Sequence, residues 1–168
     1  MKEKISVLGA GLVGSLLAIL LQKKGYKVTV YERRDDMRSL SMSAGKSINL
    51  AMSVRGWAGL DLAGLRQDIE EIAIPMHGRH IHHADGSETF QAYGKNDEAI
   101  YSVSRGELNK KLLTLAEQCG VQIEFNSRVS DVDLDSNTIS LQQNNEEVNV
   151  NDHAVVIAAD GAFSSLRN

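Results

Sequence analysis

The most informative part of this chain is the stretch Lys4-Ile5-Ser6-Val7-Leu8-Gly9-Ala10-Gly11-Leu12-Val13-Gly14. An apolar strand pattern leads into Gly-x-Gly-x-x-Gly, and a helical apolar run follows directly, as far as Leu21. A second strand pattern, 28–31, ends at Glu32, roughly 20 residues beyond the glycines. This order of strand, glycine turn, helix, strand and acidic residue is the context that a dinucleotide-binding motif needs. It predicts a Rossmann-like α/β fold with a parallel central sheet.

Each glycine of the turn has its own task in binding a pyrophosphate. Gly9 permits a tight turn, and Gly11 leaves room for phosphates at the helix N-terminus. Gly14 lets the helix pack closely on the strand, and Glu32 accepts hydrogen bonds from a ribose. From these residues alone, NAD and FAD are equally good ligands.

Arg33 and Arg34 follow the acidic residue and leave three interpretations open. The two cations would neutralise the 2′-phosphate of NADP, contact the adenosine side of a flavin, or simply face solvent. Their position in the sequence does not separate these interpretations.

The composition favours one globular, soluble domain. The chain has 168 residues, of which 42% are hydrophobic and 24% charged, and its net charge of -4 gives no electrostatic footprint for nucleic acid. The single cysteine, Cys119, excludes an internal disulfide and suits a reducing, cytoplasmic compartment. No apolar run reaches the ~18 residues that a membrane span needs.

Helices are predicted at three places. The first runs over 12–24 and ends at Gly25. Apolar spacing over 53–73 predicts two short helices with a break between them. Ser104-Arg105-Gly106-Glu107 is a capping box, which predicts the start of a helix that ends at Gly120.

Strands are predicted in the rest of the chain. The stretches 129–134, 138–141 and 148–150 predict a three-stranded antiparallel crossover sheet. The apolar run 153–161 predicts a buried parallel strand that delivers an Asp-Gly pair to the carboxyl edge of the central sheet.

Residues 76–102 change to a period of two and predict a β excursion out of the central sheet, with a hairpin turn at Asp85-Gly86. Histidines occupy positions 77, 80, 82 and 83 of this excursion. Alternation places them on both faces, and no cysteine or acidic ligand is spaced among them. A solvated strand is therefore favoured over a metal site.

Several motifs along the chain resemble the kynurenine 3-monooxygenase family of flavin-dependent aromatic hydroxylases, which are of the hydroxybenzoate-hydroxylase type. The matching stretches are 9–15, 31–32, 45–51, 55–56, 74–76, 102–105, 108–110 and 160–162. The Gly-Lys-Ser-Ile-Asn-Leu-Ala and Ser-Val-Ser-Arg stretches are the most particular to this family. Lys46 stands where the family has arginine, and Ala44 stands where it often has another basic residue.

The resemblance implies FAD as the resident cofactor and NADPH as a transient reductant. It assigns FAD contacts to Gly9, Gly11, Leu12, Val13, Gly14, Tyr31, Glu32, Arg33, Arg34, Ala51, Arg105, Val129, Asp160, Gly161 and Ser165. It also implies that Arg79 and Tyr93 hold the carboxylate of the substrate, since a guanidinium and a phenol suit that group. No catalytic acid–base residue and no metal ligand is assigned.

The implied reaction hydroxylates L-kynurenine to 3-hydroxy-L-kynurenine with O₂, a step of tryptophan degradation and NAD biosynthesis. Residues 1–75 and 103–168 would form an incomplete FAD-binding domain, and 76–102 would be strands of the substrate domain of a longer protein. Three alternatives remain. They are a flavin hydroxylase of another aromatic acid, an NAD-dependent dehydrogenase, and an isolated dinucleotide-binding module without turnover.

Overall fold

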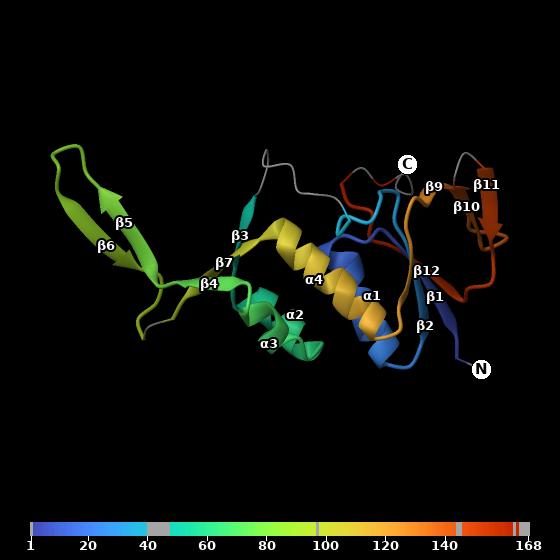
Figure 1. Ribbon diagram of the computed structural model, residues 1–168, viewed down its shortest axis with the longest axis horizontal. Coiled ribbons are helices and arrows are strands. Elements are labelled where there is room, and N and C mark those ends of the chain that lie inside the picture. The colour runs from blue at the N-terminus through green and yellow to red at the C-terminus, as the bar shows by residue number, and fades with distance from the viewer. Residues whose placement is uncertain (1, 40–47, 97, 144–145, 163, 165–168) are drawn as a thin grey trace. The chain divides into compact units, whose positions relative to one another are not determined.

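The computed structural model describes residues 2–39, 48–96, 98–143, 146–162 and 164 (Figure 1). Its contacts divide the chain into two compact units. The first unit comprises residues 1–43 and 109–168, and the second comprises residues 44–108.

A parallel sheet is the centre of the first unit (Figure 1). Its strands, in the order β12-β1-β2-β8, are β1 (Lys4–Leu8), β2 (Lys27–Tyr31), β8 (Gln122–Glu124) and β12 (Val155–Ala158). The register sets Val7 beside Val30 on one side and Ile157 on the other. The parallel sheet that the sequence predicts is therefore confirmed.

Helix α1 (Leu12–Lys23) connects β1 to β2, and helix α4 (Arg105–Gln118) precedes β8. Ala18 and Ile19 of α1 are fully buried, and its chain turns at Gly25, whose φ of 97° needs a glycine. Ser104 caps α4 as the capping-box pattern predicts, because its Oγ accepts a hydrogen bond from the N–H of Glu107 at 3.4 Å.

The antiparallel crossover sheet is also confirmed. It consists of β9 (Arg128–Asp133), β10 (Thr138–Gln143) and β11 (Glu146–Val150), in the order β11-β10-β9. Ile139 and Leu141 of β10 are fully buried and form one apolar cluster with Leu8 and Tyr31 of the parallel sheet. This cluster joins the two sheets into layers of one core.

The second unit contains an antiparallel sheet and two short helices. The sheet has the order β3-β7-β4, from β3 (Asn49–Met52), β4 (Ala73–Met76) and β7 (Ile100–Ser104), and the helices are α2 (Val54–Leu62) and α3 (Arg66–Glu70). Trp57, Leu60 and Ile69 are buried, as the helical spacing predicts.

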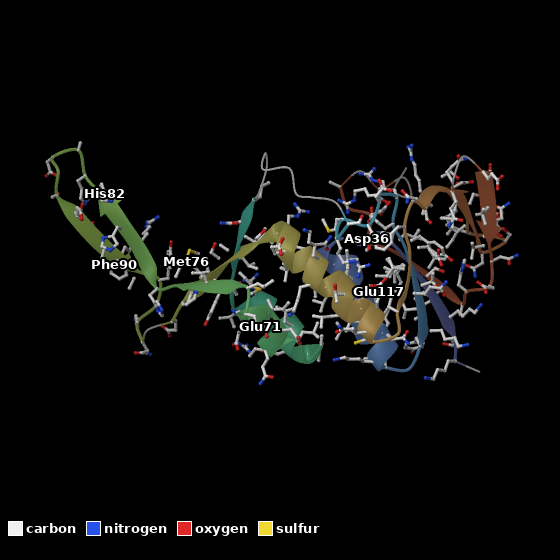
Figure 2. All side chains as sticks on the ribbon, in the orientation of Figure 1. Asp36, Glu71, Met76, His82, Phe90 and Glu117 are labelled. Carbon is white, nitrogen blue, oxygen red and sulfur yellow. The ribbon has the colours of Figure 1, made fainter. Side chains whose placement is uncertain are left out.

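The predicted hairpin is present in the second unit as β5 (Gly78–His82) and β6 (Glu88–Ala92). Figure 2 shows His82 and Phe90 on this ribbon. His82 Nδ1 lies 2.9 Å from Glu88 Oε1, and the rings of His80 and Phe90 are 5.2 Å apart. Each of these two histidines therefore contacts the residue opposite it on the neighbouring strand.

One prediction about the last strand is wrong. The apolar run over 153–161 predicted a buried strand, but β12 has a mixed exposure and Val155 is 46% exposed. Among the described residues, β12 pairs with β1 alone and is an edge of the sheet, so one side of it has no neighbouring strand. Its parallel direction, in contrast, is as predicted.

The predicted assignment of residues 76–102 to a separate substrate domain stays a prediction. In the ranges that the structure describes, no helix combines the length and the apolar character needed to cross a membrane.

Candidate dinucleotide site

The predicted nucleotide residues of the first unit follow the carboxyl ends of three neighbouring strands. Gly9 directly follows β1, Glu32 directly follows β2, and Asp160 follows the end of β12 after one intervening residue. Because the strands are parallel, these residues gather at one edge of the sheet, where open α/β sheets bind ligands.

Gly9 and Gly14 are needed for close packing of the backbone. The N–H of Gly9 donates to the carbonyl oxygen of Tyr31 at 2.8 Å, and the φ of Gly9 is 101°. A Cβ on Gly9 would lie 2.8 Å from the carbonyl oxygen of Ala159, and one on Gly14 would collide with the carbonyl oxygen of Gly9. Both positions therefore exclude a side chain for reasons internal to the fold.

Gly11 differs from its neighbours because its surroundings are open. Among the described residues other than its two chain neighbours, no heavy atom lies within 4 Å of the place where its Cβ would be, and its φ of -73° is ordinary. Helix α1 begins at the next residue, has no acidic residue in its first turn, and receives no capping hydrogen bond from a side chain in the part of the chain that the structure describes. Free N–H groups beside open space fit the pyrophosphate of a dinucleotide. Leu12 is half-buried and Val13 exposed at this turn.

Glu32 is buried, and its carboxylate organises the start of the loop after β2. Its Oε2 accepts a hydrogen bond from the N–H of Ala10 at 2.9 Å, which ties it to the glycine turn. Its Oε1 accepts from the N–H and the Nε of Arg34, at 3.0 Å and 2.8 Å. The acid is therefore held between the turn and a cation, while Arg33 is exposed.

Burial raises the pKa of Glu32, but hydrogen bonds from Arg34 and from the Ala10 N–H outweigh it, so its pKa is lowered from the ordinary 4.5. A carboxyl with a lowered pKa stabilises the fold at pH values above its unfolded pKa, and this contribution is lost as the pH falls through the folded pKa.

Wild type and Glu32→Gln are therefore expected to differ in stability by a constant amount above pH 4.5, and by less below it. Thermal unfolding of both proteins across this range measures the difference. Subtracting the stability of Glu32→Gln from that of the wild type at each pH removes the contribution of the other carboxyls that titrate in the same pH range. A stability difference that stays constant down to the lowest pH measured would contradict the role of Glu32.

Asn109 of α4 is a site residue to which the sequence analysis assigns no role, although it lies in the matching stretch 108–110. It is buried, and its Nδ2 donates to the carbonyl oxygen of Ala10 at 3.2 Å. In the described part of the chain its Oδ1 is buried without a hydrogen-bond partner. The signal in the sequence is an amide on a helix face next to the buried Leu108 and Leu112.

The other predicted cofactor residues lie in different surroundings. The side chain of Tyr31 belongs to the core between the sheets, and Val129 packs against the same cluster. Asp160 and Gly161 are exposed beyond β12, with the Cα of Asp160 2.9 Å from the place of a Cβ on Gly9. The structure thus brings Asp160 to the glycine turn.

Ala51 in β3 and Arg105 at the start of α4 are exposed. The N–H of Arg105 donates to the carbonyl oxygen of Ile48 at 3.1 Å. Ser165, Ala44 and Lys46 lie outside the described residues, so their predicted roles stay predictions.

Arg79 and Tyr93, the predicted substrate residues, lie on the hairpin. The Nε of Arg79 donates to Oε1 of its cross-strand partner Gln91 at 2.8 Å. The N–H of Tyr93 donates to the carbonyl oxygen of His77 at 2.9 Å, so the pairing continues one residue beyond each strand. Alternation then places Arg79, Gln91 and Tyr93 on the same face of the ribbon. Arg79 and Tyr93 are both exposed on that face.

Two solved structures illustrate the similarity of the fold. The p-nitrophenol 4-monooxygenase of Pseudomonas putida superposes with a TM-score of 0.78 at 23% identity, over 99% of this chain and 43% of that one. The 2-methyl-3-hydroxypyridine-5-carboxylic acid oxygenase gives a TM-score of 0.72 at 20% identity, over 95% and 40% of the two chains. They confirm the predicted α/β fold.

Sequence relatives are closer. The chain is 46% identical to a kynurenine 3-monooxygenase of Christiangramia forsetii, over 99% of this chain and 38% of that protein. It is 48% identical to one of Flavobacterium johnsoniae, over 98% and 37%. The chain thus spans less than two fifths of the length of these relatives. The family model described as FAD binding domain matches residues 2–168. The chain therefore belongs to the FAD binding domain family, and its cofactor is FAD.

Proposed function

We propose that this chain forms the FAD-binding part of an aromatic hydroxylase that converts L-kynurenine to 3-hydroxy-L-kynurenine with NADPH and O₂. The observation that best supports the proposed FAD site is the open space at Gly11, next to uncapped N–H groups of α1 and the buried Glu32. The proposed substrate is inferred from the similarity to kynurenine 3-monooxygenases, with which this chain shares nearly half of its aligned residues.

Bound FAD supplies the redox chemistry between NADPH, O₂ and the aromatic ring. The residues of this chain bind and orient the cofactor. The N–H groups of α1 hold the pyrophosphate, Glu32 accepts hydrogen bonds from the ribose, and Asp160-Gly161 lie at the same edge of the sheet. Arg33 and Arg34 flank the adenosine, and Ala51, Arg105, Val129 and Ser165 are further proposed contacts to the flavin.

Arg79 and Tyr93 are the proposed holders of the kynurenine carboxylate. They share one face of an exposed hairpin, where Gln91 already orients the Arg79 guanidinium through a 2.8 Å hydrogen bond. A planar guanidinium donates two parallel hydrogen bonds to a carboxylate, and a phenol adds a third.

Arg79→Met is expected to weaken kynurenine binding by roughly 10- to 100-fold, because a charge-assisted hydrogen bond contributes about 1.5–3 kcal/mol. Flavin content should not change. Kynurenine binding to the full-length, FAD-loaded protein is measured by perturbation of the flavin spectrum. The control is His82→Gln, which removes an ionisable group from the other face of the same hairpin. Unaltered kynurenine affinity in Arg79→Met would remove this assignment.

Kynurenine-stimulated NADPH oxidation by the full-length protein tests the function as a whole. Stimulation by L-kynurenine and none by hydroxybenzoates is the expected result. Stimulation by a hydroxybenzoate alone would favour a hydroxylase of another aromatic acid. FAD binding without stimulation by any aromatic acid would favour a nucleotide-binding module.

A further inference from the structure

Asp36 closes a compact turn, residues 36–39, after the loop that carries Glu32 and Arg34. The N–H and the Nε of Arg38 donate to Asp36 Oδ1 at 3.0 Å and 2.8 Å, and the Nη2 of Arg38 donates to Oδ2 at 2.6 Å. The N–H and Oγ of Ser39 donate to the carbonyl oxygen of Asp36 at 3.1 Å and 2.7 Å. Hydrogen bonds from Arg38 to the Asp36 carboxylate therefore hold the turn together.

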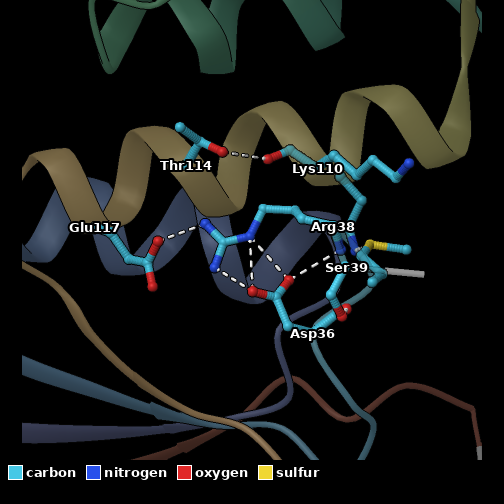
Figure 3. Close-up of polar contacts among 8 residues, drawn as sticks. Asp36, Arg38, Ser39, Lys110, Thr114 and Glu117 are labelled. Carbon is cyan, nitrogen blue, oxygen red and sulfur yellow. Dashed lines mark hydrogen bonds and ion pairs between the residues drawn. The ribbon is translucent and has the colours of Figure 1, made fainter. Parts of the chain in front are cut away.

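The same guanidinium reaches helix α4. Figure 3 shows Arg38 between Asp36 and Glu117, and the Nη1 of Arg38 donates to Oε2 of Glu117 in the last turn of the helix. The guanidinium also lies 5.7 Å from the centre of the Phe125 ring. Its side chain is 23% exposed. We call Asp36, Arg38 and Glu117 the Arg38 bridge.

The chemistry of the Arg38 bridge argues against direct phosphate binding by Arg38. All three nitrogens of its guanidinium donate to protein carboxylates. The hydrogen bonds that Arg38 donates to Asp36 and to Glu117 raise the pKa of its guanidinium, so that it stays charged. The donors of all three nitrogens therefore join two segments of the protein.

Helix α4 also reaches the nucleotide residues through Asn109, about two turns before Glu117. The Nδ2 of Asn109 donates to the Ala10 carbonyl oxygen in the glycine turn and contacts the Sδ of Met37, within the 36–39 turn, at 3.1 Å. The glycine turn and the 36–39 turn are therefore fastened to the same helix.

The other end of the loop is fastened separately. The carbonyl oxygen of Glu32 accepts from the N–H of Ser127 at 2.8 Å, and that of Arg34 accepts from the N–H of Asn126 at 3.2 Å. Segment 32–38 is thus held by residues 126–127 at its start and by α4 at its end.

We propose that Arg38 is a positioning residue for the adenosine half of FAD, a proposal that rests on the FAD site of the proposed function. By tying the 36–39 turn to α4, it fixes the loop in which Glu32 and Arg34 meet the ribose and the adenine. A loop that is ordered before binding loses less conformational entropy when the ligand arrives. Without Arg38, the carboxylates of Asp36 and Glu117 would face each other without a cation, and their repulsion would separate the turn from the helix.

Arg38→Met in the full-length protein tests this proposal. The dissociation constant of FAD, measured by titration of the apoprotein, should rise by about tenfold. The affinity for ADP, which carries the adenosine half alone, should fall by the same factor. The rate of substrate-stimulated NADPH oxidation at saturating FAD should stay at the wild-type value, because the Arg38 guanidinium donates to the carboxylates of Asp36 and Glu117 and its proposed role is in FAD affinity alone.

Arg66→Met is the matched control. Arg66 also joins two carboxylates, Asp61 and Glu70, and its guanidinium also lies over an aromatic ring, that of Trp57, at 4.7 Å. It belongs to the second unit, whereas segment 32–38 belongs to the first. Arg66→Met should therefore bind FAD and ADP as the wild type does.

Glu117→Gln provides a second test of the Arg38 bridge if Arg38→Met does not fold. It removes the charge at the exposed end of the bridge and should raise the FAD dissociation constant by about threefold. Arg38→Lys should recover part of the affinity lost in Arg38→Met. Wild-type FAD affinity in folded Arg38→Met or in Glu117→Gln, or an equal loss in Arg66→Met, would overturn the positioning role. Failure of the wild-type protein to bind FAD would instead overturn the proposed function.

Discussion

Gly11→Ala is expected to weaken FAD binding by about 100-fold and to leave the apoprotein as stable as the wild type. In the described residues, no atom beyond the two chain neighbours lies within 4 Å of the place of the new methyl group, and the φ of -73° suits alanine. The same place is where a pyrophosphate must approach the N–H groups of α1. Holding the phosphates away from these donors loses charge-assisted hydrogen bonds of about 3 kcal/mol in total, which corresponds to the 100-fold change.

Calorimetric titration of the apoprotein with FAD, together with thermal unfolding without FAD, measures both halves of this prediction. Gly14→Ala is the informative comparison, because its Cβ would collide with the Gly9 carbonyl oxygen and should destabilise the apoprotein itself. A Gly11→Ala protein that binds FAD with wild-type affinity would show that the phosphates lie elsewhere.

Glu32→Ala is expected to lower the free energy of unfolding by about 2–3 kcal/mol and to weaken FAD binding as well. The substitution leaves the N–H of Ala10 without its acceptor, and a buried donor without a partner costs about 1–3 kcal/mol. It also removes the partner of Arg34 and the acceptor proposed for the ribose.

Chemical denaturation of the apoprotein measures the loss of stability, and FAD titration measures the loss of affinity. Asp61→Ala is the control, since Asp61 forms an exposed pair with Arg66 and such pairs contribute only about 0–1 kcal/mol. A Glu32→Ala protein that is no less stable than Asp61→Ala would contradict the organising role of Glu32.

The parts of the fold that the sequence predicts correctly are those decided by local pattern. The glycine turn, helix α1, the hairpin and the three strands of the crossover sheet each carry a complete signal within a few residues. The spacing from Gly11 to Glu32 likewise predicts their meeting at one edge, because a strand–helix–strand unit has a fixed geometry. The Ala10–Glu32 hydrogen bond agrees with this spacing.

The parts that the sequence does not predict depend on contacts between distant segments. Asn109 belongs to a matching stretch that assigns it no contact, Glu117 has the pattern of an ordinary helix position, and Arg38 is one cation in a polar loop. Their partners are 72 to 99 residues away for Asn109, and 79 residues separate Arg38 from Glu117. The exposure of β12 has the same origin, because the apolar run gives the direction of the strand but not its place at an edge.

Isotope labelling tests the proposal that the full-length, FAD-dependent protein inserts oxygen from O₂ into the ring of kynurenine. The full-length, FAD-loaded protein is incubated with L-kynurenine and NADPH under isotopically labelled O₂, and the product is analysed by mass spectrometry. The expected product is 3-hydroxykynurenine that carries one labelled oxygen atom. Product that carries oxygen from water instead, or NADPH oxidation by a flavin-loaded protein that yields only hydrogen peroxide, would contradict it.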